Sequence, residues 1–118
     1  NAYKGERPGQ RFINPEELNT LLAKENDPLL LVFLDKKMVF SIKAELTELF
    51  NLFGEKLRIM LLDIEYQGVV TEKFKVHGFP AFIFCEQGKR KASFVAVSEA
   101  GMLLEVVSKN MSDTSNSL

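Results

Sequence analysis

The chain has 118 residues, of which 46% are hydrophobic and 26% charged, a composition typical of one soluble globular domain with a substantial core. Fifteen basic residues oppose sixteen acidic ones, and the net charge of −1 gives no electrostatic reason to expect nucleic acid or an anionic membrane as a partner. The single cysteine excludes an internal disulfide and a cysteine-rich metal site, and no apolar segment is long enough to cross a membrane.

The start of the chain predicts a flexible segment followed by a helix. Residues 1–10 are polar and contain two glycines and a proline, so we expect a flexible lead-in. Residues 11–13 could form a short first strand. Asn14 is a favourable helix cap and Pro15 suits the first helical position, which together predict a helix running to about Lys24.

The middle of the chain predicts three strands and a long helix. The apolar run LLLVFL at 29–34 is typical of a strand that is buried on both faces. Between 39 and 53 the apolar residues recur at helical spacing, and Gly54 is a residue that commonly ends helices. Further apolar runs at 57–62 and 81–85 predict two more strands, and we expect the second of these beside 29–34 at the centre of the sheet.

The remaining elements are shorter. They comprise a helix at 69–75, a hairpin strand at 91–96 after a tight turn at Gln87-Gly88, a final helix at 99–108 and a polar tail at 110–118 that we expect to be disordered.

One motif organises the second half of the chain. Val76-His77-Gly78-Phe79-Pro80 directly precedes the strand at 81–85, and the Phe79–Pro80 peptide bond is therefore a candidate for the cis form. This motif, together with the element order β-α-β-α-β-α-β-β-α, resembles the thioredoxin family over nearly the whole chain. The resemblance implies an α/β three-layer fold with a central mixed sheet of about five strands flanked by helices, and a domain spanning 11–109.

The same resemblance shows where the family's redox chemistry would lie. In thioredoxins a Cys-x-x-Cys motif opens the long helix after the central strand, where the helix dipole lowers the pKa of the first thiol. Here residues 35–41 read DKKMVFS and contain no cysteine, and the acid that the family buries in the preceding strand is absent near Val32. We therefore expect a redox-inactive domain, because thiol–disulfide exchange needs a thiolate.

Three other features could carry chemistry. Cys85 lies late in an apolar strand, where we expect a buried thiol that acts as a small hydrophobic residue. His77 has no second histidine or suitably spaced acid beside it, so we predict no metal site and no cofactor. The cluster Lys89-Arg90-Lys91 could contact a phosphate or an acidic partner, and it also fits a strand edge protected by charge.

The candidate site is a peptide-binding groove between two segments that the family resemblance places side by side. The first opens the long helix and the second is the loop before the strand at 81–85, where an extended peptide could pair with the backbone. The three apolar residues at 38–40 could instead pack under the helix as core, although Phe40 lies off the helical stripe. The candidate partner-binding residues are Lys36, Lys37, Met38, Val39, Phe40, Gly78, Phe79 and Pro80.

The leading hypothesis is a non-enzymatic thioredoxin-like domain that binds a protein or an extended peptide, as a chaperone-like or assembly module, alone or within a larger chain or complex. We expect neither nucleic-acid binding nor membrane insertion. One alternative is a thiol-dependent enzyme of the same fold, a one-Cys peroxidase or a transferase that uses Cys85. Another is a purely structural domain of a larger protein. An exposed and acidic thiol would favour the enzyme over the binding domain.

Overall fold

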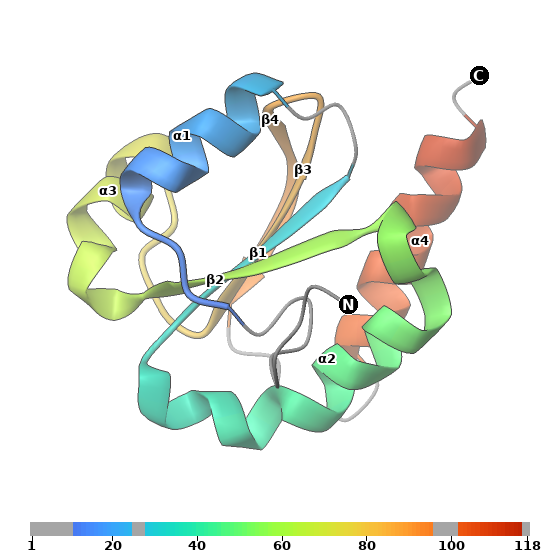
Figure 1. Ribbon diagram of the computed structural model, residues 1–118, viewed down its shortest axis with the longest axis horizontal. Helices are drawn as coiled ribbons and strands as arrows, with labels where there is room; N and C mark the ends of the chain where they lie inside the picture. Colours follow the sequence, from blue (N-terminus) through green and yellow to red (C-terminus); the bar gives the residue numbers. More distant parts are fainter. Residues whose placement is uncertain (1–10, 25–27, 96–101, 117–118) are drawn as a thin grey trace, which may run out of the picture.

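The computed structural model describes residues 11–24, 28–95 and 102–116, which form a sheet flanked by helices (Figure 1). The four strands lie in the order β2-β1-β3-β4. In chain order the elements are α1 (Pro15–Lys24), β1 (Leu29–Leu34), η1 (Lys36–Met38), α2 (Val39–Phe53), η2 (Gly54–Lys56), β2 (Arg58–Asp63), η3 (Ile64–Tyr66), α3 (Gln67–Phe74), β3 (Ala81–Glu86), β4 (Lys89–Val95) and α4 (Met102–Asn116).

The sheet is mixed, as the sequence predicts. β1 pairs with β2 in parallel and with β3 in antiparallel fashion, so the two fully apolar strands lie side by side at the centre. β4 pairs with β3 alone and forms one edge. The connection from β1 to the parallel β2 runs through α2, which is the crossover helix that a parallel pair needs.

Among the described residues the sheet has four strands, whereas the sequence predicts about five. The segment at 11–13 makes only an isolated parallel bridge, between Phe12 and Leu61. Ile13 N donates to Leu61 O at 2.8 Å and Leu61 N donates to Arg11 O at 3.1 Å, and the chain then enters α1 at Pro15. Within residues 11–13 the structure therefore shows one bridge to β2 and no full strand.

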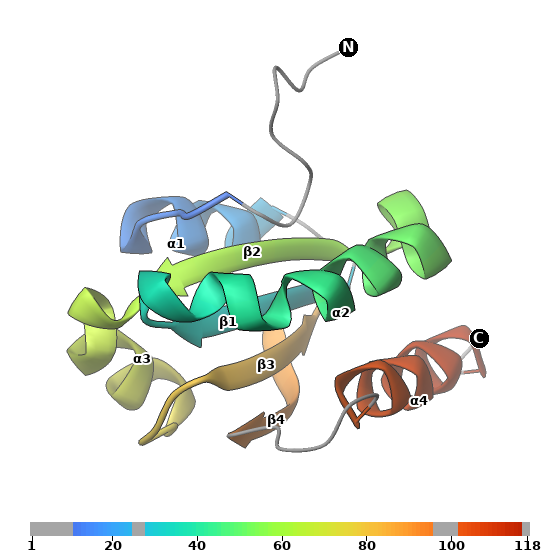
Figure 2. The same cartoon turned by 90° about the horizontal axis from the view of Figure 1, so that it is seen from below.

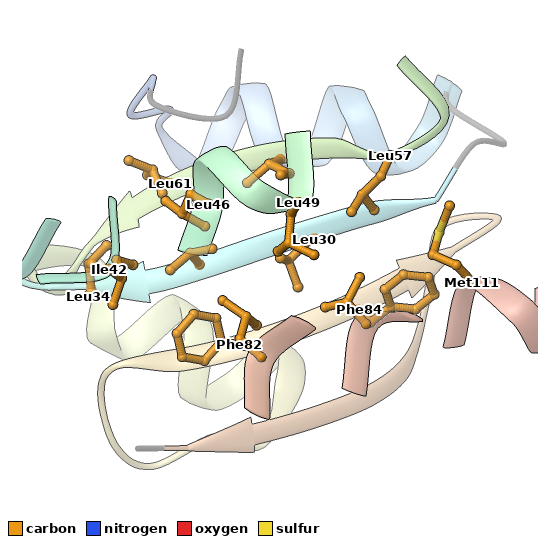
Figure 3. Packing of buried hydrophobic residues seen from close by; sticks show 14 residues of the cluster. Leu30, Leu34, Ile42, Leu46, Leu49, Leu57, Leu61, Phe82, Phe84 and Met111 are labelled. Carbon is orange, nitrogen blue, oxygen red and sulfur yellow. The ribbon is translucent and has the colours of Figure 1, made fainter. Parts of the chain in front are cut away.

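Two apolar clusters cover the two faces of the sheet. Because side chains alternate along a strand, Leu30 and Phe84 face one way while Leu31 and Cys85 face the other. On the first face the sheet packs against α2 and α4, and Figure 3 shows side chains from β1 and β3 meeting those of the two helices. On the second face it packs against α1 and α3, which gives the three layers seen in Figures 1 and 2.

Local signals in the sequence account for the helix ends. Asn14 Oδ1 accepts a hydrogen bond from Glu17 N at 2.8 Å and so caps α1, as predicted. α2 buries Ile42, Leu46 and Leu49 on one face and ends at Gly54, whose φ of 55° is a left-handed value.

The β3–β4 connection is the tight hairpin that the sequence predicts. Gln87 and Gly88 have φ values of 56° and 78°, which suits a two-residue turn between twisted strands. The Phe79–Pro80 peptide bond before β3 is cis, also as predicted.

The end of the chain differs from the prediction. We expected a helix at 99–108 and a disordered tail from 110, whereas α4 continues to Asn116. The reason is Met111, which lies one helical turn beyond Val107 and is only 9% exposed, so the tail contributes to the core. The predicted lead-in at 1–10, strand residue Ala96, helix start at 99–101 and tail end at 117–118 lie outside the described residues.

Smaller differences affect two other elements. β2 begins and ends one residue later than the expected 57–62. α3 begins at Gln67 rather than at residue 69, because η3 leads directly into it. Among the described residues no helix has the length and hydrophobicity needed to span a bilayer.

Candidate functional site

The two predicted binding segments lie at the same end of the sheet. Because β1 and β2 are parallel, both terminate at this end, where Leu34 pairs with Asp63. β3 is antiparallel to β1 and starts at the same end, where Ala81 pairs with Phe33. The opening of α2 and the loop before β3 are therefore neighbours, and Figure 1 shows both at the same end of the strands. We call the surface formed by residues 36–40 and 78–80 the corner patch.

Two carboxylates hold the first segment of the corner patch. Asp35 Oδ1 accepts a hydrogen bond from Lys37 N at 3.0 Å and so caps η1. Asp63, at the end of the neighbouring strand, accepts from Lys36 N at 3.3 Å with Oδ1 and from Glu65 N at 3.1 Å with Oδ2. The backbone at 36–38 is thus fixed to the ends of both parallel strands.

The structure divides the apolar trio at 38–40. Phe40 is 86% exposed, whereas Met38 and Val39 are half-buried against the core cluster shared by α2 and α4. The position of Phe40 off the helical stripe accounts for this difference, because the stripe turns Ile42 and Leu46 toward the sheet.

The second segment contributes an aromatic ring that is only partly covered. The ring of Phe79 packs edge-on against that of Phe33, with centroids 6.3 Å apart and planes at 88°. This contact fixes Phe79 at the end of β1, and the residue remains 42% exposed. Gly78 and Pro80 on either side of it are half-buried.

Two positive charges lie within the corner patch. Lys36 and Lys37 are both exposed. The Nζ atom of Lys36 lies 5.6 Å from the centroid of the Phe12 ring, a cation–π distance that ties the strand-like segment at 11–13 to this end of the sheet. The sequence alone did not indicate this contact, because the two residues are remote in the chain.

Sequence reasoning also missed Val69. This residue lies near the start of α3, at the end of the sheet that carries the corner patch, and it is 37% exposed. α3 buries Val70 and Phe74, and Val69 lies off that stripe just as Phe40 lies off the stripe of α2. The position of Val69 outside the buried stripe of α3 is therefore the feature of the sequence that could have indicated its exposure.

Cys85 lies away from the corner patch and is buried, as predicted. It pairs with Leu29 at the opposite end of β1 and is 1% exposed. Burial raises the pKa of the thiol to about 11, although the nearby cations Arg90 and Lys73 act in the opposite direction. His77 is exposed, and among the described residues no three or more His, Cys, Asp or Glu side chains are grouped so that they could hold a metal ion.

Comparisons with known proteins agree with this architecture. A family model described as Thioredoxin matches residues 10–109. Similar solved structures include a crystal structure of a designed protein, which is 21% identical with a TM-score of 0.69 and is matched over 89% of this chain and 94% of that chain.

A second similar chain comes from a structure that describes the thiol resolving mechanism in yeast mitochondrial 1-Cys peroxiredoxin via glutathione/thioredoxin systems. That chain is 16% identical with a TM-score of 0.69, and the match covers 87% of this chain and 99% of the other. At these identities the two likenesses show the fold alone. No curated protein matches the sequence.

Proposed function

The chain belongs to the thioredoxin family, and from this premise we propose that it is a redox-inactive member that binds extended segments of other proteins through the corner patch. The family's dithiol lies at the opening of the helix that corresponds to α2, and residues 35–41 of this chain, which lead into α2, contain no thiol. A binding role needs no thiolate and uses the same end of the strands.

The observation that carries the proposal is the exposure of Phe40. Leaving a phenylalanine in water forgoes roughly 1.5–3 kcal/mol of possible burial, and a covering partner would recover part of it. Among the described residues four large hydrophobic side chains are exposed, and two of them, Phe40 and Phe79, belong to the corner patch. Apolar surface gathered at one place is typical of an interaction site.

Charge suggests the chemistry of the bound segment. Lys36 and Lys37 border the exposed rings and favour a peptide that combines an apolar anchor with a neighbouring acidic residue. An anchor in contact with Phe40 and Phe79 would supply most of the affinity, because buried aromatic contacts dominate such interfaces.

The state of Cys85 supports the binding role over the thiol-dependent alternative. A pKa of about 11 leaves roughly one thiol in ten thousand ionised at pH 7. The side chain is also 1% exposed and lies in the apolar cluster that packs against α1 and α3, so a peroxide or disulfide substrate would have no access without local opening.

The proposal is tested by selecting binders from a random peptide library displayed on phage and measuring the affinity of the selected peptides by fluorescence polarisation. Phe40→Ser should weaken these peptides by roughly tenfold or more, because it removes an aromatic anchor. The matched control is Leu52→Ser, which removes another exposed hydrophobic side chain (59% exposed) near the far end of α2 and should leave the affinity unchanged.

Two results would refute the proposal. One is a failure to select any peptide, which would favour the purely structural alternative. The other is an equal loss of affinity in both variants, which would mean that the peptides recognise general hydrophobic surface rather than the corner patch.

A further inference from the structure

A second surface, far from the corner patch, has the character of a ligand site. It is a pocket of about 460 Å³ between α1, α3 and the β3–β4 turn. The register places it at the opposite end of the sheet, because Cys85, next to the turn, pairs with Leu29 while Ala81 pairs with Phe33. The lining residues are Asn19, Leu22, Ala23, Lys73, Phe74, Gly88, Lys89 and Arg90.

We propose that this pocket binds a small organic phosphate, a ligand with a phosphate monoester and a compact apolar body. The lining contains three cations, Lys73, Lys89 and Arg90, and no carboxylate. Within the described parts of the chain, the side-chain amines of Lys73 and Lys89 take part in no ion pair or hydrogen bond. Unpaired cations around a shared concave surface attract anions.

The charge balance favours a phosphate over a single carboxylate. α3 ends at Phe74 and α1 lines the pocket with its second half, so both helices direct the negative ends of their dipoles toward this region. Two helix ends contribute about −0.5 elementary charge each, which leaves about +2 from the three cations. A phosphate monoester carries about −1.5 to −2 at neutral pH and matches that value.

The rest of the lining fits the organic part of the ligand. Leu22, Ala23 and Phe74 supply apolar surface, and the Asn19 amide can donate or accept one hydrogen bond. The volume lies within the range of about 300–1,000 Å³ that small-molecule sites occupy. Inorganic phosphate alone would leave the apolar surface uncovered.

The walls of the pocket are fixed to one another before any ligand binds. Arg90 Nη1 donates to Phe74 O at 2.8 Å and so joins β4 to the end of α3. Gly88 lies so close to α1 that a Cβ atom on it would be 2.5 Å from Leu22 O. The site is thus already formed in the free protein, which reduces the entropic cost of binding.

The test uses phenyl phosphate as the probe and the 118-residue chain, with binding followed by amide chemical shifts at low ionic strength. The probe should shift the signals of residues 88–90 and of the second half of α1, and the affinity should fall as salt is added. The double variant Lys73→Gln/Lys89→Gln should bind at least tenfold more weakly, because it removes two charged donors.

The matched control is Lys43→Gln/Lys56→Gln, which removes the same total charge from two exposed lysines outside the pocket and should leave the affinity within about twofold of the original. A second pocket variant, Ala23→Glu, places a carboxylate at an exposed helical position in the lining and should also abolish binding. It keeps the proposal testable if the double variant folds poorly.

Several results would overturn the proposal. Absence of phenyl phosphate binding, or an equal loss in the pocket and control variants, would show that the cations form no site. An affinity for phenol equal to that for phenyl phosphate would show that charge does not contribute to binding. An affinity for inorganic phosphate equal to that for phenyl phosphate would show that the apolar lining does not contribute. The peptide-binding proposal is unaffected by any of these results, because the corner patch shares no residue with this pocket.

Discussion

The packing of Gly88 against α1 makes a quantitative prediction about alanine substitution. At Gly88 the backbone has φ +78°, and an added Cβ would lie 2.5 Å from Leu22 O. Gly54 has φ +55° with nothing within 4 Å of the added atom, and Gly68 has neither a positive φ nor a close neighbour. A comparison of alanine substitutions at the three glycines therefore separates the cost of conformational strain from the cost of steric conflict.

The expected magnitudes follow from this separation. Gly68→Ala, near the start of α3, should stabilise the protein by roughly 0.4–1 kcal/mol because it reduces the entropy of the unfolded chain. Gly54→Ala should lose roughly 1–3 kcal/mol through strain alone. Gly88→Ala should lose roughly 2–5 kcal/mol, because strain of about 1–2 kcal/mol is joined by overpacking of about 1–3 kcal/mol against a backbone atom that cannot rotate away.

The assay is urea unfolding followed by far-ultraviolet circular dichroism, with the free energy of unfolding compared at constant m-value. For a chain of this length 1 kcal/mol corresponds to about 4 °C in melting temperature, so Gly88→Ala should melt roughly 8–20 °C lower. A Gly88→Ala protein within about 0.5 kcal/mol of the original would refute the close approach of turn and helix.

Three further predictions follow from the site and from Cys85. Phe40→Ser should change the free energy of unfolding by less than about 0.5 kcal/mol, whereas Met38→Ser should lower it by roughly 1–2 kcal/mol because Met38 is half-buried. Equal losses of the two variants in denaturant unfolding would contradict the difference in burial between Phe40 and Met38. The native protein should react slowly with a thiol reagent, and rapid stoichiometric labelling would contradict the burial of Cys85. Between about pH 8.5 and 10 its free energy of unfolding should fall by about 1 kcal/mol more than that of Cys85→Ala, because the thiol ionises at lower pH in the unfolded chain than in the folded protein, where its pKa is about 11. Parallel pH profiles for the two proteins would contradict this expectation. In an insulin reduction assay the protein should show no activity above background, because residues 35–41 supply no thiolate, and any turnover that survives Cys85→Ala would show that another mechanism operates.

The parts of the fold that could be predicted from sequence are those that local chemistry determines. The apolar runs of β1 and β3, the Asn14 cap and the Gln87-Gly88 turn each contain their own signal. The extension of α4 to Asn116 could not be predicted in the same way. Met111 is buried and stabilises this end of the helix, although the sequence that follows it is polar.

The candidate site was predictable to a similar degree. The exposure of Phe40 follows from helical phase, whereas the contact between Lys36 and Phe12 depends on how remote segments pack. The pocket between α1, α3 and the β3–β4 turn illustrates the same limit. Its cations come from α3 and from the hairpin, and the sequence alone gives no indication that Lys73 and Lys89 line one pocket.

The two hydrogen bonds accepted by Asp63 have a mechanical consequence. One carboxylate fastens Lys36 N, in the turn after β1, and Glu65 N, in the turn after its own strand. The start of α2 and the start of α3 therefore share a single attachment point, although they lie on opposite faces of the sheet (Figure 2). A displacement of either helix start would strain a hydrogen bond to Asp63. We therefore expect the backbone of the corner patch and the backbone of α3 near Val69 to move together rather than independently.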